Sequence, residues 1–180
     1  MNTYISILRG INVSGKNKIK MVDLRRLYED LGFQDIVTYI QSGNVVFKTA
    51  VKQEADLLTT IEQVIESEYG FHVPVQIRTH QEMGIIVDNC PFNSLDLVEN
   101  GTKVLVTFLS QIPSAEKSEA IQQYVKAPEE LVMRGREVYL HCPNGYGRTK
   151  LSNRFLESKL KVTATTRNWR SVQKLYALSE

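Results

Sequence analysis

The order of apolar patterns over residues 1–79 constrains the fold more than any other feature of this sequence. Residues 3–8 alternate and are rich in strand formers, whereas residues 21–31 carry apolar side chains at helical spacing, with Gly32 placed to end the helix. Further strands are expected at residues 36–40, 44–48 and 73–77, and a second helix at residues 57–70. The order β-α-β-β-α-β predicts a ferredoxin-like half, with two helices covering one face of a four-stranded antiparallel sheet.

A similar order of elements follows in the rest of the chain. Strands are expected at residues 103–109, 130–133, 137–142 and 162–164, and helices at residues 115–126, 149–160 and 167–178. The residues themselves do not visibly repeat, so the similarity is one of element order. We therefore predict an α+β protein with a ferredoxin-like domain at residues 1–79, a connector at residues 80–101 and a related α+β domain at residues 102–180.

Composition and cysteine usage limit the class of protein. Hydrophobic residues make up 42% of the chain and charged residues 23%, which is ordinary for a globular protein. No apolar run reaches the roughly 18 residues of a membrane span, and the N-terminus lacks the features of a signal peptide, so we expect a cytoplasmic protein without a membrane partner. Cys90 and Cys142 are then expected to be buried thiols. The histidines lack clustered ligand spacing, and neither a metal nor a cofactor is expected.

Positive charge is concentrated in two segments. Residues 143–180 contain eight lysines and arginines against two glutamates, a net charge of +6 in a chain whose total is +2. A second excess, at Arg9, Lys16, Lys18 and Lys20, precedes the first carboxylate, Asp23. Such asymmetry favours an anionic partner, either a small molecule or a nucleic acid.

The first basic segment nearly matches a phosphate-binding loop. Residues 10–17 read GINVSGKN, against the pattern G-x-x-x-x-G-K-[ST], but Asn17 stands where a hydroxyl coordinates magnesium. The inferred sheet is also antiparallel, whereas the motif needs a parallel one. We therefore predict a basic loop whose glycines present backbone amides to an anion, and not a nucleotide-hydrolysing site. The neighbouring residues 41–44 are interpreted as a hairpin turn, with hydrogen bonding to a ligand as the alternative.

The second basic loop covers residues 143–150 and leads into a predicted helix. Thr149 is the expected N-cap, and Lys150 and Arg154 are four residues apart, which would place them on one helical face beside Asn153. We predict that the two basic loops and Arg167 serve one site. The candidate ligand-binding residues are Arg9, Asn12, Lys16, Lys18, Gln41, Asn44, Lys150, Asn153, Arg154 and Arg167.

No arrangement in the sequence supports an assigned chemistry. His141 and Cys142 are neighbours on a predicted strand and point to opposite faces, so they cannot form a nucleophile–base pair. An RNA-recognition domain has the same element order, but its aromatic stacking platform is missing here. The leading hypothesis is a binding protein for an anionic ligand, such as a nucleotide-like metabolite or a nucleic-acid backbone. The alternatives are a metal-free enzyme acting on a phosphorylated or carboxylated small molecule, and an interaction protein with Trp169 and Tyr176 at an interface.

Three segments of the sequence are distinctive: residues 8–17 (LRGINVSGKN), residues 39–47 (YIQSGNVVF) and residues 166–169 (TRNW). Together they resemble a known bacterial family, the domain of unknown function 1697. Ser14 departs from the glycine usual at that position of the family. The resemblance implies a two-part α+β protein with a ferredoxin-like first half, and it implies no activity, substrate or cofactor.

Overall fold

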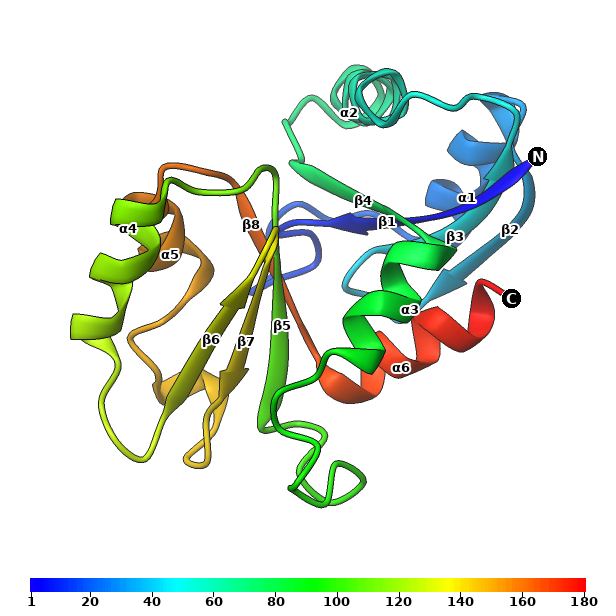
Figure 1. Ribbon diagram of the computed structural model, residues 1–180. Helices are drawn as coiled ribbons and strands as arrows, with labels where there is room; N and C mark the ends of the chain where they lie inside the picture. The colour runs from blue at the N-terminus through cyan, green and yellow to red at the C-terminus, as the bar shows by residue number, and fades with distance from the viewer. The chain divides into compact units, whose positions relative to one another are not determined.

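Both halves of the chain follow the order strand, helix, strand, strand, helix, strand, helix (Figure 1). The computed structural model describes all 180 residues. The first half contains β1 (Asn2–Leu8), α1 (Met21–Asp30), β2 (Gln34–Tyr39), β3 (Asn44–Thr49), α2 (Glu54–Tyr69), β4 (Val75–Thr79) and α3 (His80–Asp88). The second contains β5 (Val104–Leu109), α4 (Ala115–Ala120), the 3-10 helix η1 (Ile121–Tyr124), β6 (Glu130–Arg134), β7 (Glu137–His141), the 3-10 helix η2 (Tyr146–Arg148), α5 (Asn153–Leu160), β8 (Ala164–Asn168) and α6 (Trp169–Leu178).

The two sheets have the same strand order. The first runs β2-β3-β1-β4 and the second β6-β7-β5-β8, and every neighbouring pair is antiparallel. The first strand of each half is therefore an interior strand. The predicted α+β class, the antiparallel sheets and the relation between the halves are confirmed.

Each sheet packs its two crossover helices against one face. In the first half, Tyr28 of α1 and Ile61 of α2 belong to the same buried cluster as Phe47 of β3. In the second half, the cluster joins Leu140 of β7 to Leu156 of α5. Burial of this apolar surface drives the assembly, at about 25 cal/mol for each Å² removed from water.

Three element boundaries in the second half differ from those predicted. The helix expected at residues 115–126 ends at Tyr124, its last turn being η1. The helix expected from residue 149 begins at Asn153, because Ser152 and not Thr149 accepts a hydrogen bond from a first-turn amide, that of Phe155 (3.3 Å). The last strand extends to Asn168, which caps α6 by accepting from the amide of Ser171 (2.9 Å).

The chain divides into two units that do not follow its order strictly. One comprises Met1–Gly84 with Leu175–Glu180, and the other Ile85–Lys174. The sequence assigned the whole last helix to the second domain, but the end of α6 belongs to the first unit. There Tyr176 stacks on His80, with ring centroids 4.9 Å apart, and Ser179 Oγ lies 2.8 Å from His80 Nδ1.

Candidate functional site

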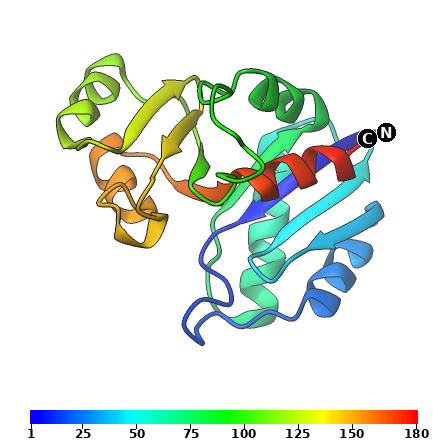
Figure 2. The same cartoon turned by 90° about the horizontal axis from the view of Figure 1, so that it is seen from below.

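The connection between β1 and α1, residues 9–20, is an ordered loop with an unusual backbone (blue in Figure 2). Its left-handed residues are Gly10, Asn12, Ser14, Gly15 and Asn17, with φ of 69°, 55°, 49°, 74° and 48°. Ser14 and Gly15 form its tip, which the Lys16 amide closes by donating to the Val13 carbonyl (2.9 Å). Asparagine and glycine tolerate this conformation best, which explains their density here.

Asn12 holds the loop together. Its Nδ2 donates to the carbonyls of Ile19 and Gln41, both at 2.8 Å, and its Oδ1 accepts from the Ile19 amide at 2.9 Å. Both amide hydrogens are therefore committed to the backbone. These bonds position the loop against the β2–β3 turn, and the expected contact of Asn12 with a ligand stays a prediction.

The β2–β3 turn packs directly against the loop. Gly43, with φ of 79°, accepts from the Leu8 amide at 2.8 Å, and a Cβ at Gly43 would lie 2.6 Å from Ile11 Cδ1. Asn44 is fully buried, and its Nδ2 donates to the carbonyl of Tyr39 (2.9 Å) and to Ser42 Oγ (3.1 Å). Asn44 thus closes the hairpin, which was the favoured interpretation of this segment. Gln41 is exposed at the tip.

A pocket of about 490 Å³ opens where the loop, the turn and the end of α2 meet. Its lining residues are Asn12, Gly15, Lys18, Ile19, Lys20, Asp23, Gln41 and Tyr69. In this topology the end of β1, the β2–β3 turn and the end of α2 lie at the same end of the sheet. The structure therefore brings together three of the predicted residues, Asn12, Lys18 and Gln41. Arg9 and Lys16 do not line the pocket.

Five of the lining residues, Gly15, Ile19, Lys20, Asp23 and Tyr69, were not among the predicted ligand-binding residues. Lys20 and Asp23 flank the start of α1, and Tyr69 ends α2 just before the left-handed Gly70. Lys20 was counted only as part of a charge excess, and Asp23 only as the carboxylate that ends it. Tyr69 comes from a distant segment, and only the fold shows that it reaches the loop.

The electrostatics of the pocket favour an anion. Lys18 and Lys20 are exposed, and no carboxylate lies within ion-pair distance of either. Burial raises the pKa of Tyr69, and the nearby charges of Asp23 and Glu68 add to this effect. The phenol therefore stays protonated and can donate a hydrogen bond at neutral pH.

The predicted residues of the second half have different surroundings. Lys150 is exposed, with Nζ 5.4 Å from the ring centroids of both Tyr124 and Phe155. Arg154 is also exposed, but the prediction that it shares a helical face with Lys150 is wrong, because α5 begins only at Asn153. The prediction that one ligand contacts both basic loops stays a prediction.

Asn153 and Arg167 are engaged inside the second half. Asn153 Oδ1 accepts from Thr166 Oγ1 at 2.6 Å. Arg167 lies on β8 and not in the predicted helix, is buried, and donates from Nη1 to the Thr166 carbonyl at 2.9 Å. Burial lowers the pKa of its guanidinium to about 10.

The hydroxyl of Ser179 lies beside His80 but is poorly placed for catalysis. Ser179 Oγ, 2.8 Å from His80 Nδ1, donates to the Tyr176 carbonyl at 2.7 Å, and Ser179 is 1% exposed. The hydroxyl hydrogen is thus directed away from the imidazole, which leaves His80 to act as the donor. No group of three or more histidine, cysteine or acidic side chains is arranged to hold a metal ion.

The thiols and the proposed interface residues are also accounted for. Cys90 and Cys142 are buried free thiols, as predicted, and burial raises the pKa of both. Trp169, which the pattern placed either in the core or at an interface, is 1% exposed and belongs to the core. None of the helices is both long enough and apolar enough to cross a membrane.

Comparison with known proteins identifies the family. Residues 1–139 match the model of a family described as protein of unknown function (DUF1697). The chain belongs to this family. The matched residues include every residue that lines the pocket of the first half, whereas the second basic loop follows them. The resemblance noted from three segments of the sequence is thereby confirmed.

A solved structure from the same comparison supports the fold. The conserved bacterial protein SP0830 from Streptococcus pneumoniae is 23% identical, with a TM-score of 0.77 over 99% of each chain. At this identity the likeness concerns the fold alone. A search of curated proteins found no match.

Proposed function

We propose that this protein binds an anionic, nucleotide-like metabolite in the pocket formed by residues 9–20, the β2–β3 turn and the end of α2. The proposal rests on one observation. Two exposed lysines, Lys18 and Lys20, line the pocket, and hydrogen bonds of Asn12 already fix the backbone of the loop that carries them. Holding the loop in advance lowers the entropic cost of ordering it around a ligand.

The charges define one end of the ligand. Lys18 and Lys20 outnumber the single carboxylate of the lining, Asp23. Like charges on a shared rim repel one another, and an anion that binds between them relieves this repulsion. A charge-assisted hydrogen bond to each ammonium contributes about 1.5–3 kcal/mol.

The remaining lining residues define the body of the ligand. Tyr69 supplies apolar surface, while Gln41 and Asp23 supply partners for hydroxyl or amino groups. The volume of about 490 Å³ lies within the range of pockets that take small molecules. A nucleoside monophosphate combines these features, because it joins one phosphate to a ring system that carries hydroxyl groups.

The experiment is calorimetric titration of the full chain with adenosine monophosphate, with inorganic phosphate and with a short oligonucleotide. We expect the nucleotide to bind best, and Lys18→Ala and Lys20→Ala each to weaken it about tenfold, equivalent to about 1.4 kcal/mol. Lys52→Ala is the matched control, since this exposed lysine lies in the same half and outside the pocket. An equal loss of nucleotide affinity in all three variants would show that the effect depends only on overall charge, and it would refute the site.

The same titration also tests whether the two basic loops serve one ligand. If they do, Lys150→Ala weakens the nucleotide as much as Lys18→Ala does. An unchanged affinity in Lys150→Ala assigns the nucleotide to the first half alone.

Two finer assignments accompany the proposal. We infer that each half is a ferredoxin-like unit, which the shared strand order supports. We also infer that the protein works in the bacterial cytoplasm, which two free, buried thiols support. Fractionation of cells that express a tagged copy tests the location, and recovery outside the cytoplasm would contradict it.

A further inference from the structure

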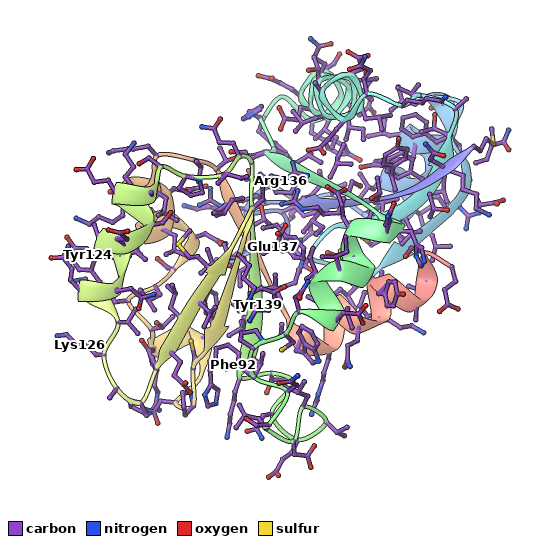
Figure 3. All side chains as sticks on the ribbon, in the orientation of Figure 1. Phe92, Tyr124, Lys126, Arg136, Glu137 and Tyr139 are labelled. Carbon is purple, nitrogen blue, oxygen red and sulfur yellow. The ribbon has the colours of Figure 1, made fainter.

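The second half has a basic pocket of its own, at a different place in the repeat. It has a volume of about 340 Å³ and lies between the end of η1 and the loop that follows β7. Its lining residues are Tyr124, Lys126, Ala127, Pro128, Glu129, Asn144, Arg148 and Lys150. Figure 3 shows Tyr124 and Lys126 on the helix side of this half, away from the labelled side chains of β7. We propose that this pocket binds adjacent phosphate groups, independently of the pocket in the first half.

The lining charges favour a ligand with more than one negative charge. Lys126, Arg148 and Lys150 face a single carboxylate, Glu129. No carboxylate lies within ion-pair distance of any of the three cations. Three cations around so small a depression repel one another, and two neighbouring phosphates would neutralise them.

The loop that carries Arg148 and Lys150 is held in a defined turn. The Gly145 amide donates to the Cys142 carbonyl (2.9 Å), and the Arg148 amide to that of Gly145 (3.2 Å). Thr149 Oγ1 accepts from the Leu151 amide at 3.1 Å, which fixes the segment after the turn. The cations therefore project from an ordered backbone, and a ligand pays less to organise them.

The aromatic side chains of this region make cation–π contacts with lysines. Tyr124 and Phe155 pack edge to face with ring centroids 5.1 Å apart. Lys150 Nζ lies 5.4 Å from both centroids, and Lys159 Nζ lies 4.7 Å from that of Tyr124. Because ammonium groups lie over both rings, a base that stacked there would have to displace a lysine. Recognition is then directed at phosphate and is independent of the base.

The test is titration of the full chain with inorganic tripolyphosphate, with butanetetracarboxylate as a carboxylate of similar charge. We expect tripolyphosphate to bind at least tenfold tighter than butanetetracarboxylate, because the planar Arg148 fork and two ammonium groups suit closely spaced phosphates. Arg148→Ala should weaken tripolyphosphate about tenfold, and Glu129→Gln should strengthen it several-fold because a repelling carboxylate is removed. Arg154→Ala is the matched control, since this exposed arginine lies outside the lining.

Two results would overturn the proposal. One is equal affinity for butanetetracarboxylate and tripolyphosphate, and the other is an equal loss of tripolyphosphate affinity in Arg148→Ala and Arg154→Ala. A thymidine oligonucleotide distinguishes the source of the phosphates. If Arg148→Ala weakens the oligonucleotide and tripolyphosphate alike, a nucleic-acid backbone can supply them, whereas loss of tripolyphosphate alone assigns the site to small polyphosphates. Lys18→Ala, which tests the first pocket, should leave tripolyphosphate binding unchanged, so the two proposals fail separately.

Discussion

The two halves share one topology, but each has been lengthened at a different connection. In the first half the β1–α1 connection spans residues 9–20, whereas its counterpart between β5 and α4 spans only residues 110–114. The relation is reversed further along, because the β3–α2 connection covers residues 50–53 and the β7–α5 connection residues 142–152. Each half thus has one long basic connection, at non-equivalent places.

This difference decides which elements can form a pocket. In the β-α-β-β-α-β order, the connection after the first strand lies beside the hairpin turn of its own sheet. The connection after the third strand lies at the other end of that sheet, beside the segment that enters the second strand. The first half therefore combines its loop with Gln41, and the second combines its loop with Lys126. The same scaffold therefore carries different pockets, each formed by its loops, where binding residues generally lie.

Buried features repeat where the loops do not. Arg78 pairs with Ile5 in the first sheet, and Arg167 pairs with Val106 at the corresponding place in the second. Both arginines are buried and donate from Nη1 to the carbonyl of the preceding residue, at 2.7 and 2.9 Å. Arg167 therefore belongs to the shared scaffold, which explains its burial better than a role in ligand binding.

The largest effect should come from the glycines of the two equivalent hairpin turns. Gly43→Ala introduces a Cβ 2.6 Å from Ile11 and 2.9 Å from Leu8 at a φ of 79°, so we expect overpacking and backbone strain together to cost about 3 kcal/mol or more. Gly135→Ala meets nothing closer than Glu137 Oε2 at 3.8 Å and should cost only about 1–2 kcal/mol, for its φ of 59°. Urea denaturation followed by circular dichroism measures both.

The comparison of the halves fails if the two alanine variants are equally stable. Only the first half packs a long loop onto its hairpin turn, and equal stability would show that this packing contributes nothing. Gly147→Ala, whose Cβ would meet no atom within 4 Å, is the control for inserting a methyl group into a loop.

The next effect concerns how tightly each long connection is held. Asn12→Ala removes three hydrogen bonds and leaves backbone groups of Ile19 and Gln41 without them, so we expect a loss of about 2–3 kcal/mol. In the second half, Ser152→Ala removes a single N-cap bond to Phe155 and should cost about 1 kcal/mol. Hydrogen exchange of the Ile19 amide should accelerate in Asn12→Ala, and unchanged exchange would contradict the role given to Asn12.

The scaffold was predictable from the sequence because its information is local and periodic. The strand-forming pattern of β1, the spacing in α1 and the left-handed positions of Gly32 and Gly70 identified the first half closely. The second half was less accessible, because several residues near Thr149 and Ser152 can cap a helix and only packing selects one. Arg167 was assigned to a helix because the short strand β8 runs directly into α6, and the sequence does not mark the boundary between them.

The pocket in the first half was only partly predictable. Lys18 stood out by charge, and Gln41 by its place in a polar turn. Asn12 was selected for the correct loop, but its bonds to the backbone are invisible in the sequence. Tyr69 needed the fold itself, since it lies at the end of a helix far along the chain. In the second pocket, the sequence predicted the basic loop at residues 143–150, with Lys150 as a contact. The lining residues 126–129 were missed because they have no periodic pattern.

The pH dependence of stability should distinguish the two cores. Burial raises the pKa of the Cys142 thiol to about 11, with a smaller contribution from Glu129, and a thiol in the unfolded chain titrates near pH 9. Stability from the neutral thiol is therefore complete below pH 9 and is lost as pH rises to 11, by about 2 kcal/mol at pH 10.5. Burial also raises the pKa of Tyr28 in the first core. The stability that this neutral phenol contributes begins to fall only above pH 10.

Comparison with Cys142→Ala isolates this contribution. The variant should be less stable than the native chain at pH 8, and the difference should shrink by about 2 kcal/mol at pH 10.5, because only the native chain carries the thiol. Denaturation curves at the two pH values measure the change. Parallel pH profiles for the two proteins would show that ionisation of Cys142 does not contribute.

The smallest expected effect is a difference in the free energy of unfolding between lysine variants of the two pockets, measured without ligand. Lys18 has no ion-pair or ring partner, so Lys18→Ala should change the free energy of unfolding by no more than about 0.5 kcal/mol. Lys150 lies over Tyr124 and Phe155, and Lys150→Ala should cost about 0.5–1 kcal/mol, the usual value of an exposed cation–π contact. In Tyr124→Leu, Lys150→Ala should cost no more than Lys18→Ala does. This double-mutant cycle would assign the extra stability to the contact between Lys150 and the ring. If Lys18→Ala destabilises the free protein as much as Lys150→Ala does, then Lys18 has a structural role, and a loss of ligand affinity in that variant no longer identifies a binding residue.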